Sequence, residues 1–228
     1  MRTWPVGVVA GCAQQSESVG APLPTPLRDC EGRWSTGVVG AHVDRWEQWC
    51  LTRPSTSRHV FVSALPGGSK SLDFALSFPA RLYSLIFASG TGGIRDADYR
   101  EAMERFRPPG VEELPPHIRE LSEAYRDANP EGLARWRELT EGAVTGNRMG
   151  QTNLNRIEWA ALEGMEAPTL LIIGEADRVM PPELFPMIAS HLPNAELAVV
   201  PEAGHMVFWE QPEAFNQLVL DFLSRHSR

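Results

Sequence analysis

The sequence predicts an α/β fold, a mostly parallel sheet with helices on both faces and a helical segment inserted between two strands. Three observations predict it. Short apolar runs alternate with helical patterns from residue 59 onward. Residues 169–173 form an unbroken apolar run, as expected of a strand buried on both faces. Residues 94–165 are rich in Glu and Arg and contain no strand-like run. The 228 residues suffice for one sizeable core.

The elements of this body are expected in a regular order. Each strand is a short apolar run followed by turn-forming residues, and the strands are expected at 59–62, 82–88, 169–173 and 197–200. A helix with apolar residues at helical spacing around Leu72 is expected to end at Pro79. Further helices are expected at 96–106, 116–128, 130–141, 153–164, 181–192 and from Pro212 to the C-terminal region. Because strand–helix–strand units build parallel sheets, the pattern favours a crossover fold.

The chain divides into three parts by pattern. Residues 1–58 are poorly patterned, with strand-like pieces only at 6–9 and 38–43. Residues 59–93 and 166–228 form the predicted core. Residues 94–165 form a helical block between two strands, which is typical of a cap, the alternative being ordinary surface helices.

Charge and composition exclude several classes of partner. A net charge of −8 argues against nucleic acid or an anionic membrane as the main partner, and no apolar run is long enough to span a bilayer. The three cysteines, Cys12, Cys30 and Cys50, have no paired metal-binding spacing, so no metal or organic cofactor is expected. A small-molecule substrate and a cytoplasmic location are expected, and the oligomeric state stays open. The alternative location is that of a lipoprotein, since residues 9–12 resemble a lipobox ending at Cys12, after a short apolar stretch.

Two polar residues follow consecutive predicted strands and form the candidate catalytic pair. Asp177 comes just after the strand at 169–173, and His205 just after the strand at 197–200. Open parallel sheets place their chemistry at these carboxyl ends. A buried Asp can hold the imidazole of a His in one tautomer, and the His can act first as base and then as acid. Either residue alone is more often structural, but together they predict this chemistry.

The segments around this pair resemble the α/β-hydrolase family. Residues 167–177 are similar to the family's acid strand, and residues 201–205 and 210–215 are similar to its histidine loop and last helix. The resemblance covers residues 59–228 and implies Asp177 as triad acid and His205 as triad base. The family orders its triad Ser, Asp, His, so the nucleophile is expected near residue 65.

The expected nucleophile position departs from the family's G-x-S-x-G elbow. Alignment of the following helix places Leu65 at the nucleophile and Pro66 after it, with Ser63 in place of the first glycine. Leucine cannot attack a carbonyl, and proline has no N–H to donate to an oxyanion. Ser63 itself is a poor nucleophile candidate, because bulky residues flank it.

A second register makes Ser69 the nucleophile. Residues 67–71 fit the pattern G-x-S-x-small, with the N–H of Lys70 as an oxyanion donor. The alternative, with Ser69 in the first turn of the following helix, is favoured. The family's early strands are shortened or absent in residues 1–58, which contain no His-Gly pair for the second oxyanion donor.

Three hypotheses follow from this departure. The chain is an active hydrolase with a degenerate elbow, a hydrolase-like binding protein that has lost its nucleophile, or a chain whose first part comes from a shifted reading frame. The favoured function is hydrolysis of a small, largely apolar ester, lactone or C–C-bonded ketone. Leu65, Trp136, Met149 and Trp159 are the candidate pocket residues, and the alternative for the last three is the interior of the cap.

Overall fold

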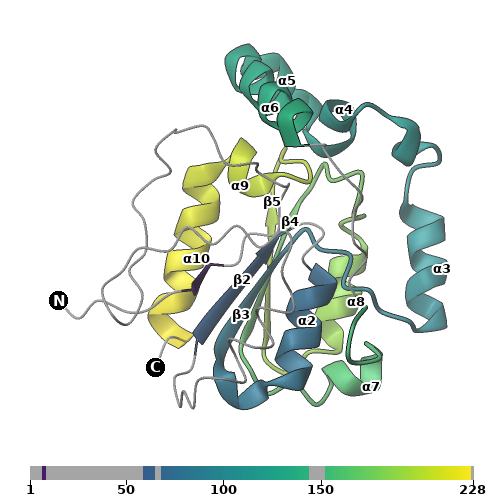
Figure 1. Ribbon diagram of the computed structural model, residues 1–228, viewed down its shortest axis with the longest axis vertical. Helices are drawn as coiled ribbons and strands as arrows, with labels where there is room; N and C mark the ends of the chain where they lie inside the picture. Colours follow the sequence, from purple (N-terminus) through teal and green to yellow (C-terminus); the bar gives the residue numbers. More distant parts are fainter. Residues whose placement is uncertain (1–6, 9–58, 65–67, 144–151, 227–228) are drawn as a thin grey trace.

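The computed structural model in Figure 1 describes residues 7–8, 59–64, 68–143 and 152–226, and its centre is a parallel sheet. The five strands follow one another in the order β1-β2-β3-β4-β5, and every neighbouring pair is parallel. They are β1 (Gly7–Val8), β2 (His59–Ala64), β3 (Leu82–Ala88), β4 (Thr169–Gly174) and β5 (Ala195–Val200). The α/β fold class predicted from the sequence is therefore confirmed.

Helices cover both faces of the sheet. Along β3, Leu85 and Phe87 belong to one buried cluster, whereas Ile86 and Ala88 belong to the other. This alternation is the two-residue period of a strand buried on both sides. The helices α2 (Gly68–Ser77) and α8 (Leu184–Ser190) pack on the first face, and α10 (Pro212–His226) packs on the second, as Figure 1 shows.

A largely helical insertion joins β3 to β4. Figure 1 shows its helices α4, α5 and α6 at the end of the molecule toward which β2 points. The helices between β3 and β4 are α3 (Ala97–Phe106), α4 (Pro116–Glu120), α5 (Glu123–Ala128), α6 (Pro130–Ala143) and α7 (Trp159–Leu162). The remaining described elements are two 3₁₀ turns, η2 (Pro79–Arg81) and η3 (Val111–Glu113), and the short helix α9 (Val207–Glu210). None of the helices in the described ranges is long and apolar enough to cross a membrane.

The predicted helix at 116–128 is divided in two by the structure. Leu121 and Ser122 adopt extended backbone angles between α4 and α5. The Ser122 side chain accepts a hydrogen bond from the N–H of Tyr125 and so caps α5. The N–H of Ser122 is donated outside the helix, to the carboxylate of Glu210. Tertiary hydrogen bonding therefore overrides the local helical pattern at this point.

The predicted helix at 153–164 is also corrected, because only its end is helical. The N–H groups of Leu154 and Asn155 are donated to the carboxylate of Asp73 on α2, at 2.8 and 2.7 Å. These two N–H groups therefore point toward Asp73 and are not available for the hydrogen bonds of a helix. Helix α7 begins only at Trp159, whose N–H is donated to Asp96 at 2.9 Å.

The remaining predictions differ little from the structure. Helix α8 is shorter than 181–192, because the chain enters it through a turn in which Leu184 N–H is donated to the carbonyl of Pro181. The strands at 59–62, 82–88, 169–173 and 197–200 are confirmed within a few residues. The strand-like piece at 38–43, and most of the segment 1–58, lie outside the described residues.

Candidate active site

Asp177 and His205 meet at the carboxyl ends of β4 and β5. Nδ1 of His205 lies 2.8 Å from Oδ2 of Asp177. The His205 side chain is 7% exposed and the Asp177 side chain is 0% exposed. An ionised carboxylate can only accept hydrogen bonds, so a neutral imidazole that donates Nδ1–H to Asp177 keeps the lone pair on Nε2. The contact expected from the sequence is present.

The backbone of its own loop holds the Asp177 carboxylate. Oδ1 accepts hydrogen bonds from the N–H groups of Val179 and Met180, at 2.8 and 2.9 Å. Oδ2 is left for the histidine. Charge-assisted hydrogen bonds of this kind fix the direction of a buried carboxylate and satisfy its charge.

A glycine lets the acid loop and the histidine loop approach closely. A Cβ on Gly174 would lie 2.2 Å from the carbonyl oxygen of Gly204 and 2.3 Å from that of Ala203, so no side chain fits there. The two loops are also hydrogen-bonded, since the N–H of Ala176 is donated to the carbonyl of Ala203 at 2.8 Å. The pair is thus built on a rigid contact between two loops.

The nucleophile side of the site is described only in part. Leu65 and Pro66 lie outside the described residues, and Ser63 is a strand residue of β2 that pairs with Phe87. Ser69 lies in the first turn of α2 and is half-buried. Among the described residues, the side-chain hydrogen bond of His205 goes to Asp177 and none joins it to Ser69.

The start of α2 packs tightly against the end of β3. A Cβ on Gly68 would lie 2.8 Å from the Cα of Gly90, so helix α2 and the end of β3 pass in backbone contact there. A residue without a side chain is therefore needed at Gly68, directly before Ser69. Ser69 then belongs to the helix.

The candidate pocket residues are placed at different ends of the molecule. Trp136 is buried in the same cluster as Met206 and Val207, which follow His205. Trp159 lies elsewhere: its ring stacks on the His191 ring with 4.1 Å between the ring centroids, and its Nε1–H is donated to Asp98 at 2.8 Å. His191 directly follows α8 and precedes β5, so this contact lies near the amino ends of the strands. His205 lies at their carboxyl ends. Met149 lies outside the described residues.

Two buried carboxylates near the site received no role from the sequence. Glu210 is 8% exposed and Asp73 is 5% exposed, and both accept hydrogen bonds from backbone N–H groups of the insertion. The sequence does contain a sign of each buried carboxylate. Glu210 is the acidic residue of the motif at 210–215, and Asp73 lies on the apolar face of α2. Within the described ranges no group of three or more His, Cys, Asp or Glu side chains could hold a metal ion.

Sequence comparison finds similar hydrolases. The model of the alpha/beta hydrolase family matches residues 22–218. A 2-hydroxy-6-oxononadienedioate/2-hydroxy-6-oxononatrienedioate hydrolase of Klebsiella pneumoniae is 27% identical over 175 residues, which are 71% of this chain and 60% of the relative. The hydrolase of the same name from Paraburkholderia phymatum is 29% identical over 185 residues, 70% of this chain and 60% of the relative. The chain thus spans about 60% of the length of these curated relatives.

Structural comparison leads to the same group of folds. A thermophilic esterase from Thermogutta terrifontis superposes with a TM-score of 0.63 at 25% identity, covering 83% of this chain and 76% of the esterase. A carboxylesterase from Bacillus subtilis superposes with a TM-score of 0.56 at 23% identity, covering 78% and 64%. The second likeness supports the fold alone.

Proposed function

The chain belongs to the alpha/beta hydrolase family, and we propose that it is a hydrolase of weak or lost activity for a small, largely apolar ester, lactone or C–C-bonded ketone, with Asp177 and His205 as the acid–base pair of a nucleophile–His–Asp triad. The observation that carries this proposal is the buried 2.8 Å contact between these two side chains at the carboxyl edge of the sheet. The names of the similar proteins, hydrolases of an oxo-dienedioate and an esterase, support the choice of bond.

In the proposed mechanism His205 moves the proton. Nε2 accepts a proton from the attacking hydroxyl group, and the imidazolium then gives that proton to the leaving group. Asp177 stays ionised, holds Nδ1–H and stabilises the imidazolium. Because both side chains are almost fully buried, their interaction is little screened by water.

The nucleophile limits this proposed activity. In the favoured register the position holds Leu65 and the oxyanion donor position holds Pro66, so the hydroxyl group and one N–H are both missing. Loss of one oxyanion donor alone lowers turnover roughly 10²–10³-fold in known hydrolases. We therefore expect weak or absent turnover, with Ser69 as the nucleophile of the alternative register.

The helical insertion is the proposed cap. Its helices α4, α5 and α6 lie toward the carboxyl ends of the strands, and Trp136 of α6 shares a buried cluster with Met206 beside His205. An apolar wall at this position fits an apolar acyl group. The alternative is that the cap and the pair form a ligand-binding site without turnover, which the residues Leu65 and Pro66 favour.

A fluorophosphonate probe separates these proposals. We expect no stoichiometric labelling of the native chain and little hydrolysis of p-nitrophenyl butyrate. Labelling at Ser69, abolished by Ser69→Ala and slowed by His205→Ala, would overturn the Leu65 register. A folded, unlabelled chain that binds apolar ketones supports the binding protein. The family match begins at residue 22, which disfavours a frame shift across all of 1–58, and three-frame translation of the neighbouring DNA tests this alternative.

A further inference from the structure

Glu210 is a buried carboxylate that joins two segments of the molecule. It ends α9 and is 8% exposed. Its Oε1 and Oε2 accept a hydrogen bond from the N–H of Gly204, at 3.1 and 3.0 Å, and Oε2 accepts another from the N–H of Ser122 at 3.0 Å. Gly204 directly precedes His205, and Ser122 lies in the insertion. One side chain therefore holds the histidine loop and the insertion together.

The two segments also touch through their backbones. A Cβ on Gly204 would lie 2.6 Å from the N of Ser122 and 3.1 Å from the carbonyl oxygen of Glu120. No side chain fits between the histidine loop and the insertion at this point. A shift of the chain at residues 120–122 is thus transmitted to the residue before His205 without a flexible side chain between them.

The local structure of the insertion makes this bond possible. A continuous helix over 116–128 would direct the N–H of Ser122 along its own axis. The break between α4 and α5 instead directs that N–H to Glu210. A buried carboxylate needs such donors, since its charge is otherwise unsatisfied in the protein interior.

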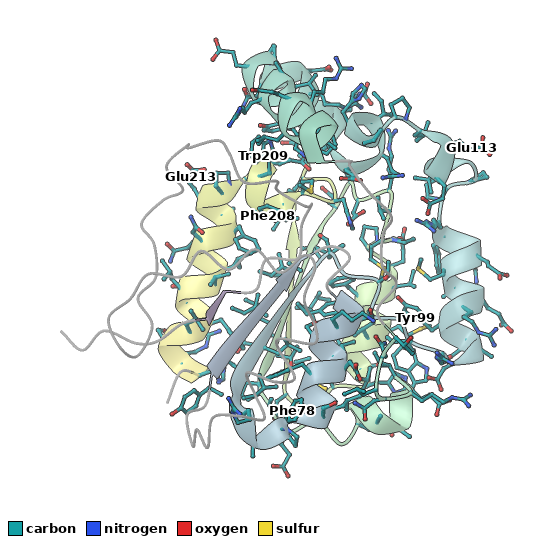
Figure 2. The ribbon with its side chains drawn as sticks, viewed as in Figure 1. Phe78, Tyr99, Glu113, Phe208, Trp209 and Glu213 are labelled. Atoms are coloured by element: carbon teal, nitrogen blue, oxygen red, sulfur yellow. The ribbon has the colours of Figure 1, made fainter. Side chains whose placement is uncertain are left out.

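The surroundings of Glu210 belong to both parts. Tyr125 of α5 packs against the cluster that contains Met206 and Val207, and so does Trp209 of α9. In the view of Figure 2, Trp209 lies closer to the insertion helices than Phe208 does. Burial raises the pKa of the Tyr125 hydroxyl, and the nearby charge of Glu210 adds to this rise.

We propose that Glu210 is a positioning residue, through which the place of the insertion sets the orientation of His205. It touches neither the reacting atoms nor the imidazole, and acts through the backbone N–H of Gly204. Its importance for turnover rests on the proposed function, in which His205 is the base. The link between the insertion and the histidine ring does not need turnover, so it is testable in an inactive chain.

The test follows the imidazole of His205 by proton–nitrogen NMR in the full chain, with the ring signal identified by its loss in His205→Asn. Glu210→Gln removes the charge and, with its carbonyl oxygen at the Oε2 position, places an amide N–H₂ 3.1 Å from the N of Gly204, so the hydrogen bond at Oε1 becomes a contact between two donors. We expect loss or a marked upfield shift of the Nδ1 proton signal. Glu213→Gln is the matched control, because Glu213 is an exposed carboxylate at the start of α10 (Figure 2).

A second pair of variants isolates the donor on the insertion. Ser122→Pro deletes the N–H, and the native φ of −64° at Ser122 and ψ of 141° at Leu121 both suit a proline. Its ring carbon takes the place of the hydrogen that faces Oε2 of Glu210, so the variant also pushes the two segments apart. Ser122→Ala keeps the N–H but removes the same hydroxyl cap of α5. We expect the His205 signal to move in Ser122→Pro and to stay in place in Ser122→Ala.

The outcomes separate a positioning role from a general loss of stability. Spectra are compared at a temperature where the circular dichroism of each variant equals that of the native chain. Movement in Glu210→Gln and Ser122→Pro, with neither control affected, supports the proposal. Equal spectra for Ser122→Pro and Ser122→Ala, or an unmoved signal in folded Glu210→Gln, overturn it and leave the proposed function standing. If Ser122→Pro does not fold, Glu210→Gln decides alone. If both fail to fold, faster hydrogen exchange confined to Gly204 and Ser122 in Glu210→Asp supports the link, and unchanged exchange overturns it.

Discussion

The two halves of the candidate site differ in how much of the family's chemistry they retain. The acid–base half, at the ends of β4 and β5, contains the buried pair Asp177 and His205 in hydrogen-bonding contact. The nucleophile half, between β2 and α2, has Leu65 and Pro66, in the register favoured by the sequence, at the positions expected to supply a hydroxyl and an N–H. Under the proposed function, one half is complete while the other lacks two functional groups.

This difference shows that the two halves are stabilised by different interactions. Asp177 is held by N–H groups of its own loop, and Gly174 lets the histidine loop pass over it. These contacts also hold the fold together, so they persist whether or not turnover occurs. The close packing of α2 against the end of β3 is supplied by Gly68 and Gly90, so it does not require a nucleophile.

Restoring the nucleophile half should have the largest effect. The double variant Leu65→Ser/Pro66→Ala supplies a hydroxyl and a backbone N–H at the two deficient positions, with Gly67 and Gly68 already in place. We expect the fluorophosphonate probe to change from no labelling to stoichiometric labelling of Ser at position 65. Turnover of p-nitrophenyl butyrate should rise by at least about 10²–10³-fold, the effect of one oxyanion donor.

Its control is the same double variant with His205→Ala, in which the gain should disappear. Labelling that persists at full rate without His205 would show that the introduced serine does not use the acid–base pair. Absence of any gain in a folded double variant would contradict the Leu65 register.

The second prediction concerns Asp177 in this restored background. Asp177→Asn keeps the size of the side chain but favours the wrong tautomer of His205, and in a serine triad this change lowers turnover about 10⁴-fold. We expect a loss of that order in the rate of p-nitrophenyl butyrate hydrolysis. The control is Asp221→Asn, which makes the same carboxylate-to-amide change at an exposed position of α10. It should leave the rate unchanged.

The acid–base half could be predicted from the sequence because each element is local. An apolar run followed by Asp, and another followed by Gly-His, specify strand ends that a parallel sheet brings to one edge. The contact between Asp177 and His205 then follows from the order of β4 and β5. The strands and the helix at 212–226 were predictable for the same reason.

The breaks in the insertion could not be predicted in this way. The helical pattern at 116–128 gives no sign that the N–H of Ser122 is donated to Glu210, 88 residues away in sequence. The pattern at 153–164 likewise gives no sign that the carboxylate of Asp73 accepts hydrogen bonds from the N–H groups of Leu154 and Asn155. In both segments a distant carboxylate decides the local structure. The position of Trp159 could not be predicted for a related reason, because its stacking partner His191 is distant in sequence and only the fold brings the two rings together.

The third prediction compares the two close glycine contacts by stability. Gly174→Ala forces a Cβ to 2.2 Å from a backbone oxygen of the histidine loop, so the loops must separate. We expect a loss of about 3 kcal/mol in the free energy of unfolding, at the upper end for overpacking. Gly68→Ala meets the Cα of Gly90 at 2.8 Å, a less severe approach than at Gly174, so we expect a smaller loss. Urea unfolding of both variants measures the difference, and equal losses would contradict it.

The smallest expected effect is that of Ser69→Ala, which tests the remaining alternative for the nucleophile half. Ser69 is half-buried in the first turn of α2, and within the described residues its hydroxyl has no hydrogen bond to His205. A substitution at such a position changes the free energy of unfolding by no more than about 0.5 kcal/mol. In the Leu65→Ser/Pro66→Ala background, Ser69→Ala should leave labelling and turnover unchanged, because the introduced hydroxyl is three residues before the helix. A tenfold or greater loss there would mean that Ser69 takes part in the chemistry, and the nucleophile half would then contain a hydroxyl that the favoured register assigns to the helix.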